Sequence, residues 1–409
     1  MKTLVLLGDG MADFPLPELN NKTPLEAAKT PAMDAMAREG LLGLFCPIPD
    51  GFAPGSDIGN LSLFGYNPAE TFTGRAPLEA ARQGILLGPN QVAFRCNLVT
   101  LGDGAMQSFT SGHISTEEAR SIIASLNDAY KGFPVRFHSG VSYRHLCVVD
   151  AESMPIETLA AIACEPPHNI SDQQYAPYLP NGDGSEFIRE LMDRSRAVLS
   201  AHPINAARRA NNKPEATSIW LWGQGRSPKL ERYQDRYHIT GAVISAVDLV
   251  NGIGVCAGFE VIPVEGATGY LDTNYEGKVA AGLDALNRHD FVYIHLEAPD
   301  ETSHEGRTDL KLQAIEDFDA RVVAPCLAAA KQRGDVRVVV APDHITAIST
   351  KTHASGPVPF VLYGPGIAHN DANEYNERAA AATGVLLRDG YKLVPSVIQQ
   401  ASIAPASYA

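Results

Sequence analysis

The 409-residue chain is 45% hydrophobic and 20% charged, and its 47 acidic and 33 basic residues give a net charge of −14. This composition is not that of a disordered protein, and the acidic balance argues against a broad contact with the phosphate backbone of nucleic acid. The length exceeds what one hydrophobic core usually supports, so we expect two domains.

The distribution of apolar residues and cysteines predicts a cytoplasmic protein without membrane association. The four-residue apolar run Leu4 to Leu7 is too short for a signal sequence, and no apolar stretch approaches the ~18 residues of a membrane span. The six cysteines form no CxxC pair and no compact framework, so we expect them to be reduced.

The first 65 residues alternate between strand and helix signals. The run at residues 4–7 predicts a strand, and Thr30 followed by Pro31 predicts the start of a helix that ends at Glu39. Residues 41–45, LLGLF, then predict a short buried strand. The chain therefore begins as an α/β domain.

The character of the chain changes at residues 82–212. VAFRCNLVTL and RHLCVVD predict strands, and Ser115 with Glu118 forms a capping box before a helix to Asp128. Residues 165–184 are rich in proline, asparagine and glycine and predict a long loop that serves as a hinge or a lid. We expect a smaller α+β domain here.

From Ser218 onward, apolar strands alternate again with helices. The predicted helices are Tyr275–Asn287 and Arg307–Arg333, and the predicted strands are SIWLW, GAVISAVDLV, GFEVIPV, FVYIHLEAP, VRVVVAP and VPFVLYG. Continuous apolar strands separated by helices indicate a parallel sheet covered on both faces. The expected organisation is a discontinuous α/β domain, residues 1–81 and 213–409, interrupted by an inserted domain at 82–212.

Aspartates and histidines follow several of these strands. Open α/β sheets bind ligands beyond the carboxyl ends of their strands, so we expect these residues to converge. A mixture of carboxylate and imidazole suits divalent ions, and two such ions support phosphoryl or sulfuryl transfer. The predicted ligands are Asp9, Asp300, His304, Asp343, His344 and His353. His295, inside a predicted strand, we expect to be structural.

Ser56 lies in the turn APGSDIGN, where a helix N-terminus favours an anion. A metal ion at its oxygen would make this serine a nucleophile. Alternatively, Ser56 or Asp57 caps the following helix. No nucleotide motif competes with this interpretation, because GIGVCAG has its third glycine one residue late and no GxxxxGK[ST] loop is present.

Seven segments resemble the archaeal-type cofactor-independent phosphoglycerate mutases of the alkaline phosphatase superfamily, over nearly the whole chain. They are LVLLGDGMAD, FAPGSDIGNLSLFGYNP, FTGRAPLEAA, AFRCNLVT, GATGYLDTNYEGK, HLEAPDETSHEG and APDHITAISTKTH. The resemblance implies an alkaline-phosphatase-like, parallel-rich sheet sandwiched by helices, with an inserted substrate-binding domain. It also implies interconversion of 2- and 3-phosphoglycerate without 2,3-bisphosphoglycerate.

The resemblance further implies two manganese, magnesium or zinc ions, and Ser56 as the residue that becomes phosphoserine. One ion would be bound by Asp9, Ser56, Asp343 and His344, and the other by Asp300, His304 and His353. A substrate with carboxylate and phosphate groups needs cationic donors, and the insert offers Arg95, His113, Arg144 and His145, with Arg75 and Lys229 as weaker candidates. Each of these could instead be a solvated surface charge.

Other functions remain open from the sequence. IWLWGQGRSPKL resembles a branch of the family that has been proposed to be a homoserine kinase, and homoserine would favour an acidic partner. A phosphomonoesterase or a non-catalytic metal- or phosphate-binding protein would keep the same fold. The intact set of Ser56 and six ligands argues against lost catalysis. The sequence does not determine the oligomeric state.

Overall fold

The computed structural model describes residues 1–152 and 154–400 and divides into two compact units. The first unit comprises Met1–Phe72 and Lys229–Ala409, and the second comprises Thr73–Pro228. An insertion is therefore present, but its boundaries lie nine residues earlier and sixteen residues later than the expected 82 and 212. The reason is packing within the second unit, where α5 (Ala76–Arg82) contacts two of its strands.

Within the described residues, the first unit is built on an eight-stranded sheet with the order β15-β2-β14-β11-β1-β10-β8-β9. The strands are β1 (Lys2–Gly8), β2 (Leu41–Phe45), β8 (Gly241–Ile244), β9 (Glu260–Val261), β10 (Phe291–Leu296), β11 (Val336–Ala341), β14 (Val358–Tyr363) and β15 (Leu386–Leu387). The central strand β1 is parallel to both β10 and β11. β14 is antiparallel to β11 and to β2, so the sheet is parallel-rich rather than wholly parallel.

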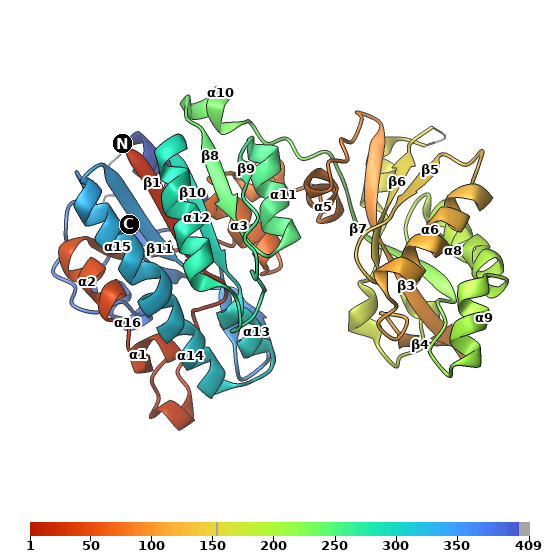
Figure 1. The fold of residues 1–409 in the computed structure, drawn as a ribbon, viewed down its shortest axis with the longest axis horizontal. Helices are drawn as coiled ribbons and strands as arrows, with labels where there is room; N and C mark the ends of the chain where they lie inside the picture. The colour runs from red at the N-terminus through yellow and green to blue at the C-terminus, as the bar shows by residue number, and fades with distance from the viewer. Residues whose placement is uncertain (153, 401–409) are drawn as a thin grey trace. The chain divides into compact units, whose positions relative to one another are not determined.

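Helices cover both faces of this sheet. α2, α12 and α15 pack on one face, where the apolar core includes Leu4, Val292 and Val338 (Figure 1). On the other face, α11 contacts β8, α17 contacts β1, and Phe64 at the end of α3 stacks on Tyr293. The helices of the unit are α1 (Pro24–Ala27), α2 (Pro31–Glu39), α3 (Ser56–Leu63), α4 (Pro68–Thr71), α10 (Tyr233–Tyr237), α11 (Asp248–Ala257), α12 (Tyr275–Arg288), α13 (Ala298–His304), α14 (Thr308–Phe318), α15 (Ala324–Arg333), α16 (Glu377–Ala382) and α17 (Leu393–Gln399).

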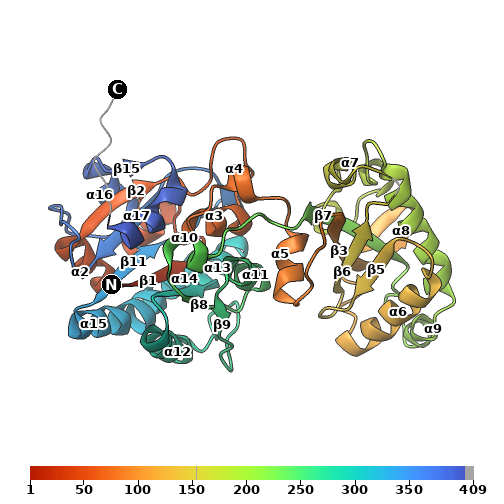
Figure 2. The same cartoon turned by 90° about the horizontal axis from the view of Figure 1, so that it is seen from above.

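The second unit is an antiparallel sheet with helices α6, α8 and α9 against one face (Figure 2). The helices pack over an apolar core that includes Phe94, Leu126 and Leu191. The strands are β3 (Gln91–Gly102), β4 (Ala105–Ser108), β5 (Val135–His138), β6 (Arg144–Asp150) and β7 (Ser218–Arg226), and the helices are α5, α6 (Thr116–Ala129), α7 (Ile156–Ala161), α8 (Ser185–Ser200) and α9 (Pro203–Ala210). The expected capping box of Ser115 and Glu118 is present at the start of α6.

Three sequence predictions about individual elements are wrong. SIWLW was expected in the parallel sheet, but β7 pairs antiparallel with β3 in the second unit. GAVISAVDLV divides into β8 and the start of α11, in which Leu249 and Val250 are buried. In GFEVIPV, only Glu260 and Val261 form a strand.

The long loop at residues 165–184 packs on its own unit. Its main chain at Ser171 pairs with Met106, and the Trp220 indole donates a hydrogen bond to the carbonyl of Glu165, 2.8 Å away. Ile170 and Pro167 are buried there. In the part of the chain that the structure describes, no helix is long and apolar enough to cross a membrane.

Candidate metal centre

The predicted ligands lie at one edge of the sheet of the first unit. β1, β10 and β11 are adjacent and parallel, so the residues that follow them meet at the same edge. This topology brings together Asp9, Asp300, His304, Asp343 and His344. His353 joins them from β13 (Thr352–Ala354), which forms a hairpin with β12 (Ile345–Ala347) directly after His344.

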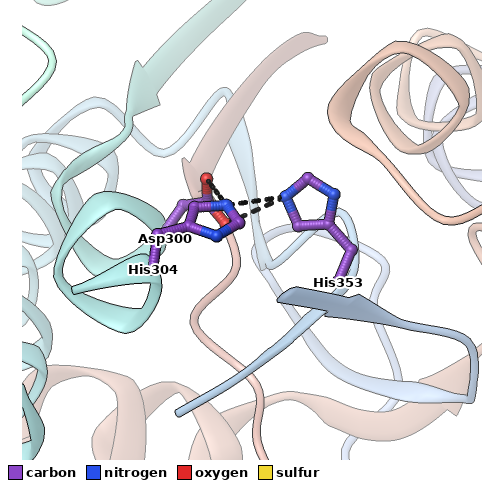
Figure 3. Close-up of side chains that lie close together, drawn as sticks. All are labelled: Asp300, His304 and His353. Atoms are coloured by element: carbon purple, nitrogen blue, oxygen red, sulfur yellow. Dashed lines mark hydrogen bonds and ion pairs between the residues drawn. The ribbon is translucent and has the colours of Figure 1, made fainter. Parts of the chain in front are cut away.

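Asp300, His304 and His353 form one group of candidate ligands (Figure 3). Both histidines direct their Nε2 atoms at the Asp300 carboxylate, at 3.2 Å for His304 and 3.4 Å for His353, and these two Nε2 atoms are 3.0 Å apart. The Nδ1 of His304 is 2.9 Å from the carbonyl oxygen of Lys351, to which it can donate. That hydrogen bond leaves Nε2 available to bind a metal ion, and a metal-bound histidine usually donates its other ring nitrogen in this way.

Asp9, Asp343 and His344 form a second group around Ser56, and all three are fully buried. The Nε2 of His344 lies 3.3 Å from Asp9 Oδ1, 3.5 Å from Asp343 Oδ2 and 3.2 Å from the Ser56 hydroxyl oxygen. The ligand atoms of Asp9, Asp300 and His344 also lie within 4.8 Å of one another, so Asp300 adjoins both groups.

The charges of this site call for cations. Burial, reinforced by the carboxylates of Asp343 and Asp300, raises the pKa of Asp9 well above its usual value. Burial lowers the pKa of His344, which favours the neutral imidazole, whose lone pair can bind a metal ion. Asp9 Oδ1 is buried and has no hydrogen-bond partner among the described residues. Buried carboxylates in this arrangement are stable only when paired, and bound divalent ions would supply the missing charge.

Ser56 does not cap its helix. Gly55 is the N-cap residue, and no side chain accepts a hydrogen bond there. Among the described residues, Asp57 Oδ1 accepts a hydrogen bond from the adjacent main-chain nitrogen of Ile58, at 2.9 Å, and from no other group. The capping alternative for Ser56 is therefore wrong, and its hydroxyl is directed at His344.

Sequence reasoning did not single out Asn60, which connects the serine helix to the aspartates. Its Nδ2 donates to Asp343 Oδ2 at 2.8 Å and to the Ser56 carbonyl at 2.9 Å, while its Oδ1 accepts from the Tyr293 hydroxyl at 2.8 Å. Asn60 is fully buried and lies one helical turn after Ser56. The sequence signal for a role of Asn60 in the site was its position four residues after Ser56, as a polar side chain among apolar ones.

His295 contacts Asp9, although we expected it to be structural only. Its Nε2 is 2.8 Å from Asp9 Oδ2, and its Nδ1 is 3.1 Å from the Ser245 hydroxyl. Burial lowers the pKa of His295 to about 3, so the ring is neutral. A neutral ring that accepts from Ser245 donates from Nε2 to Asp9, and thereby orients that carboxylate.

Gly10 makes room for this arrangement. Its φ is 58°, and a Cβ atom there would lie 2.3 Å from the Thr346 hydroxyl oxygen and 2.6 Å from Asp300 Oδ1. Gly10→Ala is expected to displace both side chains, weaken metal binding and reduce activity, in addition to a backbone cost of about 1 to 2 kcal/mol. Calorimetric titration with Mn²⁺ measures the first effect.

Gly334→Ala is the matched control for Gly10→Ala. Gly334 has a φ of 68° at the end of α15, and a Cβ atom there would meet nothing within 4 Å. It should lower the melting temperature through the same backbone strain and leave metal binding intact. Equal effects of the two substitutions on metal binding would contradict the steric argument.

The substrate-binding candidates Arg95, His113, Arg144 and His145 all belong to the second unit. Arg95 is largely buried beneath α5, with its Nε 3.1 Å from Glu79 and its guanidinium 4.0 Å from the centre of the Trp222 ring. Burial lowers the pKa of Arg95 to about 10, so it stays charged at neutral pH. Arg95 pairs with Leu146 of β6. Arg144 lies two residues from Leu146 on the same strand, so the Arg144 side chain is on the same face of the sheet as that of Arg95.

The other two candidates lie elsewhere. His145 pairs with Cys96 on the opposite, helix-covered face, and burial lowers its pKa to about 4, so it is neutral. Its Nδ1 accepts a hydrogen bond from the main-chain nitrogen of Gly140 at 3.0 Å. His113 is exposed in a turn with a φ of 51°. The structure therefore does not place His145 beside Arg95 and Arg144, because neighbouring residues of a strand face opposite ways.

Comparisons with known proteins agree on one family. Residues 37–205 match the family model described as 2,3-bisphosphoglycerate-independent phosphoglycerate mutase. A probable mutase of this type from Geobacter sulfurreducens is 49% identical over 98% of this chain and 100% of its own length. The mutase from Methanosarcina acetivorans is 48% identical over 94% of this chain and 96% of its own.

Solved structures give the same result for the fold. A protein from Pyrococcus horikoshii superposes with a TM-score of 0.83 at 29% identity, over 100% of this chain and 99% of its own. The cofactor-independent phosphoglycerate mutase from Thermoplasma acidophilum superposes with a TM-score of 0.66 at 25% identity, over 98% and 100% of the two chains. The predicted α/β fold class, with its parallel-rich sheet, is confirmed.

Proposed function

The chain belongs to the family of 2,3-bisphosphoglycerate-independent phosphoglycerate mutases, and from this premise we propose that it interconverts 2- and 3-phosphoglycerate through a phosphoserine at Ser56. The main support for this proposal is that the two groups of candidate metal ligands lie next to each other, with the Ser56 hydroxyl oxygen 3.2 Å from His344 Nε2. Homoserine as the substrate is not favoured, because the relatives carry the mutase name. We also propose that the protein is located in the cytoplasm.

The donor set fits two divalent cations, manganese, magnesium or zinc. Asp9, Ser56, Asp343 and His344 would hold one ion, and Asp300, His304 and His353 the other. Three carboxylates and three imidazoles suit these ions, which bind both oxygen and nitrogen. When bound, the ions supply positive charge that activates a hydroxyl and stabilises the phosphoryl group in transfer.

The chain's own residues perform the transfer as follows. The Ser56 oxygen forms a bond to phosphorus while the bond from phosphorus to the substrate oxygen breaks, and the serine proton passes, in net, to the released hydroxyl of glycerate. The reverse displacement by the other glycerate hydroxyl regenerates Ser56. His295 and Asn60 hold Asp9 and Asp343 in place during both steps. Water must be excluded, because its attack on phosphoserine would release phosphate.

The decisive assay follows 2-phosphoglycerate formation from 3-phosphoglycerate by the purified protein with Mn²⁺, in the absence of 2,3-bisphosphoglycerate and ATP. Isomerisation under these conditions is the expected result. A parallel reaction with ATP and homoserine tests the alternative substrate, and formation of phosphohomoserine instead of isomerisation would overturn the proposal. Release of phosphate alone would identify a phosphomonoesterase.

For substrate recognition, we propose that Arg95 binds an anionic group of the substrate. Its charge and its fixed position between Glu79 and Trp222 support this role. Arg95→Ala is expected to lower kcat/KM by an amount equivalent to about 1.5 to 3 kcal/mol, because a charge-assisted contact is lost. Steady-state kinetics with 3-phosphoglycerate measures this effect.

Arg209→Ala is the control for Arg95→Ala. Arg209 also pairs with a glutamate in the second unit, Glu215 at 2.6 Å, but its side chain is exposed. Its removal should leave kcat/KM unchanged. If Arg95→Ala lowers only the melting temperature and not kcat/KM, the arginine serves packing rather than substrate binding.

A further inference from the structure

Lys311 on α14 is a fully buried cation next to the metal centre. An ammonium group has three donors, and three oxygens lie within reach. Nζ is 2.7 Å from the carbonyl of Thr346, 2.9 Å from Asp13 Oδ2 and 3.3 Å from the carbonyl of Ala12. Burying a charge is unfavourable unless it is fully hydrogen-bonded, and here every donor has an acceptor.

These acceptors come from the two loops that carry the aspartates of the second ligand group. Ala12 and Asp13 belong to the segment that begins with Asp9 after β1, and Thr346 lies two residues beyond His344 after β11. The same loops are joined by hydrogen bonds from the main-chain nitrogen of Thr346 to the Ala12 carbonyl, 3.2 Å, and from that of Ile348 to Asp13 Oδ2, 3.2 Å. Lys311 therefore fixes one loop against the other.

The side chain of Thr346 connects the two ligand groups directly, and it is fully buried. Its hydroxyl donates to Asp300 Oδ1 at 2.5 Å and lies 3.1 Å from His344 Nδ1. A hydroxyl has one proton, so the bond to Asp300 requires that His344 Nδ1 be the donor in the second contact. The lone pair of His344 then lies on Nε2, the atom directed at Ser56 and Asp9.

We propose that Lys311 and Thr346 are positioning residues that fix the two metal-ligand groups relative to each other. Thr346 joins Asp300 of one group to His344 of the other through a single hydroxyl, and Lys311 holds the Thr346 main chain. Neither side chain is one of the proposed ligands. This inference rests on the proposed function, because it assumes that the site binds two cations.

The first test compares Thr346→Val with Thr346→Ser in the full-length protein. Valine keeps the shape but removes the hydroxyl, and serine keeps the hydroxyl. Calorimetric titration of the metal-free proteins with Mn²⁺ should show a loss of affinity of roughly 10- to 100-fold for valine. Electron paramagnetic resonance should show loss or change of the spin-coupled signal of two neighbouring Mn²⁺ ions. Serine should restore both properties.

The second test compares Lys311→Met with Arg337→Met. Arg337 is also a buried cation of the first unit, and it donates to the carbonyls of Pro365 and Val397 at 2.8 and 2.7 Å near the start of β11. Both substitutions should lower the melting temperature, but only Lys311→Met should weaken Mn²⁺ binding and alter the coupled signal.

Two outcomes would overturn the inference: Mn²⁺ binding by Thr346→Val equal to that of the wild type, or equal metal-binding losses in Lys311→Met and Arg337→Met. Failure of the wild-type protein itself to bind two Mn²⁺ ions would overturn the proposed two-metal site instead. The wild-type titration therefore separates failure of the inference from failure of the proposed function.

Discussion

Ser56→Ala is expected to abolish isomerisation, with a loss of roughly 10⁴- to 10⁶-fold in kcat. Alanine has no oxygen to receive the phosphoryl group. The metal ligands are otherwise untouched, so Mn²⁺ should still bind. The coupled assay measures the loss, and metal analysis of the same preparation shows that the site is still loaded.

Ser62→Ala is the control for this substitution, because Ser62 lies on the same helix and its hydroxyl donates to the carbonyl of Pro47, at 2.5 Å. It should retain activity. Incubation with radiolabelled phosphoglycerate should transfer label to the wild type and to Ser62→Ala but not to Ser56→Ala. Full activity in Ser56→Ala would remove the phosphoserine mechanism.

Removal of the metal ions is expected to abolish activity reversibly. Asp9, Asp300 and Asp343 are buried together, and Asp9 Oδ1 has no hydrogen-bond partner in the part of the chain that the structure describes. The carboxylates therefore repel one another without cations. Chelation followed by dialysis should give inactive protein, and added Mn²⁺ should restore both activity and thermal stability. The two-metal site would be contradicted if the protein stayed active although metal analysis detected no bound ion.

The metal-free protein should also become less stable as the pH rises from 6.5 to 9. The hydrogen bond from His304 to Asp300 raises the pKa of His304 to about 9 from an ordinary value of 6.5. The resulting stabilisation is fully present below pH 6.5 and is lost as the pH rises through 9, because the folded state then releases its extra proton. Saturating Mn²⁺ replaces the proton and should reduce this pH dependence, as melting curves can measure.

Much of the fold follows from local sequence signals. Local signals predicted the strand at residues 4–7, the helix that ends at Glu39 and the capping box at Ser115 and Glu118. These features depend on residues close together in the chain, so the apolar pattern and the capping residues are visible in the sequence. A strand at residues 358–363 was predictable for the same reason. Its antiparallel direction was not, because direction depends on partners distant in the chain.

The sequence also determined which residues gather at the candidate site. Asp9, Asp300 and Asp343 each follow an apolar strand, and parallel strands leave their carboxyl ends at one edge. The turn APGSDIGN added Ser56 to this set, and the family resemblance supplied the expected activity. The predicted gathering of the aspartates required only the order of the elements and the chemistry of their side chains.

Only the tertiary structure decided the contacts that orient those residues. His295 and Thr346 lie in strands whose side chains are mostly buried. Nothing in the local sequence reveals that His295 contacts Asp9, or that Thr346 joins Asp300 to His344. The assignment of β7 to the second sheet and the separation of His145 from Arg95 depended likewise on strand register. Register and side-chain direction arise from pairing between distant segments, where a shift of one residue reverses the face, so local sequence does not specify them.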